Sequence, residues 1–395
     1  MVSLLKSDFG VIVKEQSLHD RFNERCVTYV KAVLSELLSE QFSLLQSGTL
    51  FPNFTGIRIK DSTKLMVPRS LEADYPACGG DKRSLSQAGI SIQYEYDLKS
   101  GQITDLTITP GTRNDRTDAT ETAHRMEKGD LILRDLGYFS TPVLEKCAAG
   151  EAFFLSRLNC STHVYDENGH LISFKETYAW MKKSGIVEKE LVAYVGKQTK
   201  LPVRLILQQV PPQVYEKRIR DKTQQSRGQG RGQLTEETKI RCRFNLFITN
   251  ADSSMLPVSQ VFPLYRIRWQ IELQFKIWKS VFKIGQWHEM KQERYLSLLY
   301  VKLIWIIMNL QITYSLQQGF IQPGQGKIRV ISLNKSLKTL KTLFDKVFIM
   351  LRGSVRKARE MAHYIQDRLG DNHWLESKKK KLCLPDILQL FICIT

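Results

Sequence analysis

The stretch YRIRWQIELQFKIWK, residues 265–279, carries polar residues that share one face of a predicted helix. An α-helix advances about 100° per residue, so residues three, seven and fourteen positions apart lie within roughly 60° of one another. Tyr265, Arg268, Glu272 and Lys279 stand at these spacings, and Lys276 joins them. One stripe therefore carries a single acid among three cations and a phenol, while the other faces are largely apolar.

Two interpretations fit this stripe. A carboxylate among cations on a packed helix suits a divalent metal ion beside a phosphodiester. In the other interpretation the stripe faces solvent and holds ordinary ion pairs four residues apart, Arg268 with Glu272 and Glu272 with Lys276. The stretch alone supports both equally, so the rest of the chain has to decide between them.

Length and charge describe a globular protein with a polyanionic partner. A chain of 395 residues with 42% hydrophobic residues buries a large core and favours two or three domains. Its 58 Lys and Arg residues exceed its 40 Asp and Glu residues, which gives a net charge of +18. This excess favours nucleic acid first and a membrane surface second as the partner.

The cysteines and the apolar runs indicate a reducing compartment. Seven cysteines with no C-x-x-C pair argue against a disulfide framework or a zinc ribbon. The first ten residues lack an apolar signal core. The most apolar run, residues 303–312, is too short to span a bilayer and contains Asn309 and Gln311. We therefore expect a buried core helix there, and a cytoplasmic protein without a membrane segment.

Helical periodicity marks the first part of the chain. Residues 16–47 show apolar positions at helical spacing, which predicts a small helical N-terminal region over residues 1–50. Its cations Arg21, Arg25 and Lys31 are candidates for DNA contacts, although a solvated helical face is the more common arrangement.

After Pro52 the pattern changes to strands and helices in alternation. This order predicts an α/β domain with a mixed sheet over residues 51–158. The predicted elements are strands at 54–63, 89–98 and 102–109, a helix at 115–128, a buried strand at 130–139, a helix at 142–149 and a strand at 152–158.

Residues 159–243 differ in composition from this domain. Paired strands are predicted at 189–197 and 202–210, followed by a long loop at 216–243 that is rich in Arg, Lys, Gln and Gly. The segment is therefore predicted to be a β-rich insertion. A strand at 243–250 returns the chain to the α/β domain.

The remaining chain is predicted to be helical. The second part of the α/β domain is expected over residues 244–318, and a C-terminal helical region over residues 319–395. A Gly/Pro loop at 319–327 and a basic run near the end of the chain belong to that last region.

Acidic residues at strand ends are candidates for a metal site. Phosphoryl chemistry commonly uses two divalent cations about 4 Å apart, held by carboxylates from distant parts of the chain. Asp61 ends the first predicted strand, Asp135 lies within or just after the fourth, and Glu272 adds an acid from the helix. A single Asp at a strand end is more often a turn or a cap. The competing acids are Asp74, Asp81, Asp105, Asp115, Asp118 and Asp130.

These motifs resemble DDE transposases of bacterial insertion sequences, in the IS-four family with the YREK signature. That signature, Y-x2-R-x3-E-x6-K, matches the stripe of residues 265–279 at every spacing. The segments IKDSTKL around Asp61 and LRDLGYFS around Asp135 resemble the two aspartate motifs of the family. The resemblance covers about residues 15–320, including SLHDRFN at 17–23.

The resemblance implies a fold, a cofactor and a reaction. The fold is an RNase H-like mixed sheet with a β-rich insertion, flanked by N- and C-terminal helical regions. Asp61, Asp135 and Glu272 are expected to be catalytic and to bind two Mg²⁺ ions, for which Mn²⁺ substitutes. Water nicks the end of the element, and the freed 3′-hydroxyl attacks a phosphodiester, through a hairpin end in members of this type.

The resemblance also implies partners. Tyr265, Arg268 and Lys279, together with Lys276 on the same stripe, are expected to bind DNA at the terminal phosphates. The expected partners are the inverted-repeat ends of the element, target DNA and a second copy of the chain in a synaptic complex. The expected location is the bacterial cytoplasm, at the nucleoid.

One departure keeps two alternatives open. Relatives usually carry a longer helical segment before the stretch at 17–23, where this chain has about sixteen residues. A truncated or inactive relic that only binds DNA is therefore one alternative to an active transposase. An RNase H-like nuclease without strand transfer is the other.

Overall fold

The computed structural model describes residues 2–41, 51–77, 88–159, 162–228, 230, 232–319, 329–376 and 384–389. Asp81, most of the predicted Gly/Pro loop at 319–327 and most of the basic run near the C-terminus lie outside these residues, as do four of the seven cysteines. The chain divides into two compact units. Unit 1 comprises Met1–Leu50, Asp61–Arg113 and Trp269–Thr395, and unit 2 comprises Phe51–Lys60 and Asn114–Arg268.

The strands form one mixed sheet in the order β3-β2-β1-β4-β5-β9-β8-β7-β6. Strand β1 (Ile57–Met66) crosses from unit 2 into unit 1 along the chain. It pairs in parallel with β4 (Leu131–Arg134), and β4 pairs in parallel with β5 (Phe153–Arg157). The other described pairings are antiparallel, including β2 (Gly89–Asp97) with β3 (Ile103–Pro110). The predicted mixed α/β class is confirmed.

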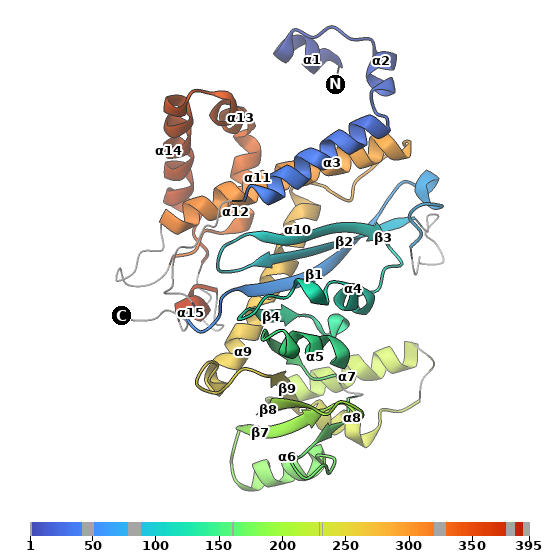
Figure 1. Cartoon of the computed structure of the whole chain (residues 1–395), viewed down its shortest axis with the longest axis vertical. Coiled ribbons are helices and arrows are strands. Elements are labelled where there is room, and N and C mark those ends of the chain that lie inside the picture. The colour runs from blue at the N-terminus through green and yellow to red at the C-terminus, as the bar shows by residue number, and fades with distance from the viewer. Residues whose placement is uncertain are drawn as a thin grey trace. The chain divides into compact units, whose positions relative to one another are not determined.

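Unit 2 is organised around β4, a strand with four consecutive buried residues. Such a run is expected for a strand covered on both faces. Figure 1 shows α4 (Asp115–Glu121) and α5 (Thr141–Ala149) on the viewer's side of this part of the sheet. Two 3₁₀ turns, η2 (Ala123–Arg125) and η3 (Leu136–Tyr138), come before and after β4 in the chain.

The insertion in unit 2 mixes strands with helices. Its antiparallel strands are β6 (Val164–Tyr165), β7 (Glu188–Val195) and β8 (Leu201–Gln209), and β8 pairs with β9 (Phe244–Thr249). Its helices are α6 (Phe174–Lys183), α7 (Pro212–Gly228) and α8 (Glu236–Arg241). One hydrophobic cluster joins β4, β5, β7, β8 and β9 to α5 and α6, so the insertion shares the core of unit 2.

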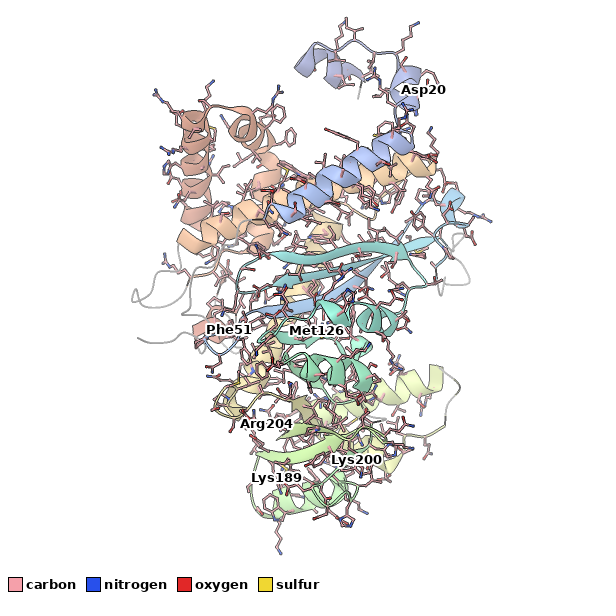
Figure 2. All side chains as sticks on the ribbon, in the orientation of Figure 1. Asp20, Phe51, Met126, Lys189, Lys200 and Arg204 are labelled. Atoms are coloured by element: carbon pink, nitrogen blue, oxygen red, sulfur yellow. The ribbon has the colours of Figure 1, made fainter. Side chains whose placement is uncertain are left out.

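Arg204 ties the insertion to the chain after β9. Its guanidinium donates to the carbonyl oxygens of Ala251 at 2.6 Å and Leu256 at 3.0 Å, and to the carboxylate of Glu190 on β7 at 2.6 Å. Figure 2 labels Arg204 among the strands of the insertion. These bonds fix the loop that leads into α9 (Val258–Ile267).

In unit 1 the helix α10 (Trp269–Ser280) packs on β2 through aromatic side chains. Trp278 and Phe275 meet the buried ring of Tyr94 edge-on, with centroids 4.9 and 6.0 Å apart. Burying a side chain of this size stabilises the fold by roughly 2–3 kcal/mol. The buried face of α10 therefore fixes the orientation of its polar face.

The long helix α11 (Gln292–Gly319) is central to unit 1. The span Gln292–Gln317 is long enough and apolar enough to cross a membrane. This is weak evidence for a membrane segment, because the core helices of soluble proteins meet the same criteria. The predicted apolar run at residues 303–312 is therefore one part of a longer helix. The predicted core role is confirmed, because Leu303, Ile306 and Leu310 are buried.

Helices from both ends of the chain accompany α11. Helix α3 (Glu24–Ser39) runs beside it, as Figure 1 shows, after the short α1 (Val2–Phe9) and α2 (Glu15–Asp20). Helix α12 (Leu333–Thr342) also contacts α11, and Thr313 and Ser336 share a buried hydrogen bond of 2.8 Å. The C-terminal region continues with α13 (Phe344–Arg352), α14 (Val355–Asn372) and α15 (Leu384–Gln389).

Three local predictions are wrong. The strand predicted at 130–139 ends at Arg134, because the 3₁₀ turn η3 begins at Leu136, directly after Asp135. The loop predicted at 216–243 contains the helices α7 and α8. The single helix predicted at 265–279 is divided into α9 and α10 at Arg268, although the backbone of Arg268 keeps helical angles (φ −48°, ψ −33°). The predicted domain boundaries stay a prediction.

Candidate functional site

In unit 2, Asp135 lies at the carboxyl end of β4. It is the last extended residue before η3, with φ −71° and ψ 162°, and its side chain does not cap that turn. The carboxylate is 44% exposed. Asp135 therefore presents its oxygens at the end of a buried strand, as the sequence predicts for a residue just after β4.

The nearest described partner of this carboxylate is Arg268. One guanidinium nitrogen of Arg268, Nη2, lies 3.5 Å from Asp135 Oδ1. The Arg268 side chain is only 12% exposed. The ion pair is thus held by a nearly buried cation, and it joins two motifs that lie 133 residues apart in the chain.

Tyr265 fixes α9 to the same strand end. Its ring packs edge-on against Phe247 of β9, with centroids 5.2 Å apart. Its hydroxyl donates to the backbone carbonyl of Arg134 at 3.3 Å. Burial, with a smaller contribution from the charge of Asp135, raises the pKa of Tyr265 to about 12. The phenol therefore stays protonated near neutral pH and acts as a donor.

The other members of the predicted site belong to unit 1. Asp61 is half-buried on β1, and its Oδ1 accepts a hydrogen bond from the backbone N–H of Ser62 at 2.8 Å. Glu272 is half-buried in the first turn of α10, where the helix dipole favours a negative charge. Both are oxygen donors of the kind that Mg²⁺ prefers.

Two lysines continue the polar face of α10. Lys276 is exposed, with its ammonium nitrogen 4.7 Å from the ring centroid of Trp269. Lys279 is also exposed by surface area, yet partial desolvation lowers its pKa. Both lie on the exposed side of a helix whose opposite side is packed.

The register of β1 and β4 relates the two aspartate motifs. Lys60 is the last β1 residue paired with β4, and its partner is Arg134. The next residue in each strand is an aspartate, Asp61 and Asp135. Each aspartate therefore comes directly after one member of the same residue pair, Lys60 or Arg134.

Competing acids have structural partners. Asp130 is buried and lies 2.7 Å from the guanidinium of Arg58. Asp118 is buried and lies 2.6 Å from the ammonium of Lys60. Both pairs are internal to unit 2, so these two acids serve the fold. Asp105 accepts from the Thr107 hydroxyl at 2.7 Å.

The pair between Lys60 and Asp118 was not predicted from the sequence. Lys60 is fully buried, and its ammonium also donates to the Thr122 hydroxyl at 3.2 Å. The sequence signal is a lysine that follows Ile57 and Ile59 in a predicted strand, directly before Asp61. Charged side chains are rarely fully buried unless paired, so this position called for a partner.

Three carboxylates gathered at one point would mark a metal site directly. Within the described part of the chain no group of three or more His, Cys, Asp and Glu residues is close enough to hold a metal ion. Asp135 belongs to unit 2, whereas Asp61 and Glu272 belong to unit 1. The three-carboxylate site therefore stays a prediction from sequence.

Comparisons with known proteins identify the family. A model of the transposase DDE domain matches residues 52–308. The chain is 31% identical over 403 residues to the transposase for insertion sequence element IS231F of Bacillus thuringiensis subsp. israelensis, covering 96% of this chain and 82% of that protein. It is 31% identical to the transposase for element IS231E of Bacillus thuringiensis subsp. finitimus, with the same coverage. The transposase for element IS1151 of Clostridium perfringens is 28% identical, covering 81% of this chain and 70% of that protein.

The match with the DDE domain includes the motifs around Asp61, Asp135 and Glu272. It confirms the predicted RNase H-like class of fold, to which the mixed sheet conforms. It also implies an enzyme that depends in general on divalent metal ions. The chain belongs to the family of insertion-sequence transposases with a DDE domain.

Proposed function

We propose that this transposase cuts DNA at the ends of an insertion sequence and joins the freed end to target DNA, through a hairpin end. The observation that carries the proposal is the ion pair between Arg268 and Asp135, at 3.5 Å. This contact brings the arginine of the YREK signature to the acid of the second aspartate motif. A cation beside a carboxylate suits a site that binds a phosphate and a metal ion together.

The proposed catalytic acids are Asp61, Asp135 and Glu272. The pairing of Lys60 with Arg134, the residues directly before the two aspartates, supports them as a pair. Glu272 follows Arg268 by four residues in the chain, and Arg268 contacts Asp135. Two of the competing acids, Asp118 and Asp130, form buried ion pairs with Lys60 and Arg58, which argues against a role for these two in the metal site.

These acids fit a pair of Mg²⁺ ions, with Mn²⁺ as a substitute. All three are carboxylates, the hard ligands that these ions prefer, and none is fully buried. When bound, two such ions activate the attacking oxygen and stabilise the leaving oxygen of an in-line displacement. Asp61, Asp135 and Glu272 would hold them.

Each step breaks one P–O3′ bond; attack by water leaves a phosphomonoester, and attack by a 3′-hydroxyl forms a new phosphodiester. In nicking, water forms a bond to phosphorus and the P–O3′ bond breaks, leaving a 3′-hydroxyl and a 5′-phosphate. That 3′-hydroxyl then attacks a phosphodiester of the opposite strand and displaces the 3′-oxygen of the flanking DNA, which forms the hairpin. A second water attacks the hairpin phosphodiester and releases the 3′-hydroxyl and a 5′-phosphate. In strand transfer the 3′-hydroxyl attacks a target phosphodiester and displaces the target's own 3′-oxygen.

The cations of the signature are proposed to hold the DNA end. The planar guanidinium of Arg268 offers paired donors to phosphate oxygens, and the ammonium of Lys279 offers a point charge. Lys276 extends the same face. Tyr265 holds Arg134, and hence Asp135, through its hydroxyl, because the raised pKa keeps that hydroxyl protonated.

We also propose the partners, the oligomeric state and the cellular location of this transposase. The partners are the inverted-repeat ends of the element and target DNA, and a net charge of +18 supports binding to these polyanions. A homodimer would hold both ends in one synaptic complex. The location would be the bacterial cytoplasm at the nucleoid.

The test uses the full chain with a DNA fragment carrying flanking inverted repeats. Nicks, hairpins and joined products are scored with Mg²⁺, with Mn²⁺ and with a chelator. Asp61→Asn, Asp135→Asn and Glu272→Gln are each expected to reduce nicking to the level of the chelated sample. Asp74→Ala, which changes an exposed acid, is the control.

The outcomes separate the candidate functions. Joined products support the transposase, cleavage without joining supports the nuclease, and binding alone supports the relic. Nicking that survives replacement of Asp135 would overturn the assignment of the acids.

A further inference from the structure

Helix α7 (Pro212–Gly228) is the longest helix of the insertion and has no buried residue. Five cations and two acids give it a net charge of +3. It occupies much of the segment predicted as a loop, so its charges stand at fixed helical positions. Figure 1 shows it beside the strands of unit 2.

Polar side chains anchor one face of α7. Arg218 donates through Nη1 to the carbonyl of Phe244 at 2.7 Å and through Nη2 to Asn245 Oδ1 at 2.6 Å, both on β9. The guanidinium of Arg243 lies 4.1 Å from the ring centroid of Tyr215. This face is half-buried at Tyr215, Arg218, Ile219, Lys222, Thr223 and Ser226.

The opposite face carries an exposed stripe, which we call the outer stripe: Lys217, Arg220, Gln224 and Arg227. At about 100° per residue these four lie within roughly 80° of one another. The flanking acids Glu216 and Asp221 stand four residues from Arg220 and Lys217, a spacing that permits ion pairs. Neither pair forms in the described structure.

Helix α8 (Glu236–Arg241), also in the insertion, is a useful contrast. Its Lys239 lies 2.7 Å from Glu236, and its Arg241 lies 2.7 Å from Glu237. On α8 each cation is thus neutralised by a neighbouring acid. The three cations of the outer stripe keep their charge available to a partner.

We propose that the outer stripe of α7 binds the phosphate backbone of duplex DNA. Residues 217 and 227 are about 15 Å apart along the helix axis, at a rise of about 1.5 Å per residue. Duplex DNA carries one charge per roughly 1.7 Å of its axis, so the stripe spans several phosphates. Lys, Arg and Gln all donate hydrogen bonds to phosphate oxygens, which positions DNA without reading its sequence.

The inference adds a second DNA contact, separate from the proposed acids. It rests on DNA as the partner of the transposase family and not on Asp61, Asp135 or Glu272. The stripe would hold duplex at sequences outside the reacting phosphodiester. Because such binding needs no divalent metal, it is measurable with a chelator present.

The experiment measures binding of a random-sequence duplex of about 30 base pairs by the full chain in chelator, over a range of salt concentrations. The test variant is Lys217→Gln with Arg220→Gln and Arg227→Gln. The matched control is Lys175→Gln with Lys182→Gln and Lys183→Gln, which removes three exposed cations from α6. Thermal unfolding of both variants verifies that they fold.

The test variant is expected to lose on the order of tenfold in duplex affinity at low salt. Its log–log salt slope should fall by about 2–3, since each lost phosphate contact removes about 0.9. The control should keep the wild-type slope. An unchanged slope in the test variant, or an equal fall in the control, overturns the proposal. A loss for single-stranded RNA with no loss for duplex DNA also overturns it.

The two proposals fail separately. If the acids are wrongly assigned, nicking survives in Asp135→Asn while the salt slope still depends on the outer stripe. If the stripe is wrongly assigned, the slope is unchanged while nicking still depends on Asp135.

Discussion

The hydroxyl of Tyr265 donates to the backbone carbonyl of Arg134 at 3.3 Å, and the next residue after Arg134 is Asp135. Tyr265, which lies 131 residues further along the chain than Arg134, thus fixes the end of the buried strand β4 next to Asp135. The same acid meets Arg268, three residues after Tyr265, at 3.5 Å. Tyrosine and arginine of the signature therefore position one carboxylate from two directions.

Replacing Tyr265 by Phe removes this hydrogen bond and keeps the ring. We expect a loss of about 1 kcal/mol in the free energy of unfolding, measured by urea titration. Burial raises the pKa of Tyr265 from 10.0 to about 12. Stability from this phenol is therefore complete below pH 10.0 and is lost as the pH rises toward about 12.

Wild type should accordingly lose more stability than Tyr265→Phe over that alkaline range. The pH profile of nicking near neutrality should keep its shape in the variant, because a phenol with this pKa is not the base. If the nicking rate of Tyr265→Phe no longer changed with pH near neutrality as that of wild type does, the phenol would be the base and our interpretation would be wrong.

Replacing Arg268 tests its role at the DNA end. Arg268→Gln removes the cation beside Asp135, so binding of a nicked or hairpin end should weaken by on the order of tenfold. Affinity for intact duplex should change much less. Arg268→Lys should restore part of the effect, because the ammonium keeps the charge and loses the paired donors.

The measurement compares the dissociation constants for cleaved-end and intact duplex DNA. Lys175→Gln, which removes an exposed cation from α6, is the control. If Arg268→Gln weakens binding of both DNAs equally, as the loss of any surface cation would, the contribution of Arg268 is non-specific charge.

For the buried pair of Lys60 and Asp118, we expect removal of one charge to destabilise the protein more than removal of both. Lys60→Met leaves the Asp118 carboxylate buried without its ammonium, so we expect a loss of about 3–5 kcal/mol in the free energy of unfolding. Lys60→Met with Asp118→Leu replaces both charges and should recover much of that loss. A double-mutant cycle by urea unfolding measures the coupling. Additive effects of the two substitutions would show that the pair is not coupled.

The carboxylate of Glu289 is expected to stabilise unit 1 in a way that depends on pH in the acidic range. Its carboxylate accepts from the backbone N–H of Arg69 at 2.9 Å and of Ser70 at 3.3 Å, at the 3₁₀ turn η1 (Arg69–Leu71). These bonds lower the pKa of Glu289 below its usual 4.5. Its stabilising effect is therefore present above pH 4.5 and is lost as the pH falls through the lowered pKa.

Glu289→Gln removes this titration. The urea midpoint of the variant should fall less steeply than that of wild type between about pH 5 and pH 3. Glu376→Gln, on an exposed glutamate of the same unit, is the control. If the urea midpoints of wild type and Glu289→Gln fell equally with pH, Glu289 would not contribute to the pH dependence of stability.

The sequence by itself determined the elements and the motifs. Periodicity of apolar residues is a local signal, so it located most strands and helices, including β2, β3, β5 and α5. The fixed spacing of the signature in residues 265–279 placed its polar residues on one side of a helical segment. Family resemblance then followed from the motifs around Asp61 and Asp135.

The sequence could not predict α7, and the reason is physical. The helix has no buried residue and is anchored by guanidinium bonds from Arg218 to β9. Its stability therefore comes from polar contacts with a distant strand, which leave no apolar period in the local sequence. The charges that predict a loop include those of its exposed outer stripe.

Only the tertiary structure decided which charges meet. The contacts of Lys60 with Asp118, and of Arg268 with Asp135, join residues 58 and 133 positions apart. Such pairs form because the sheet and its packed helices hold the two side chains close together. The spacing of the residues along the chain does not predict these contacts. The sequence named the acids and cations of this transposase, and the fold determined which of the acids in unit 2 are bound by structural cations and which one meets the signature arginine.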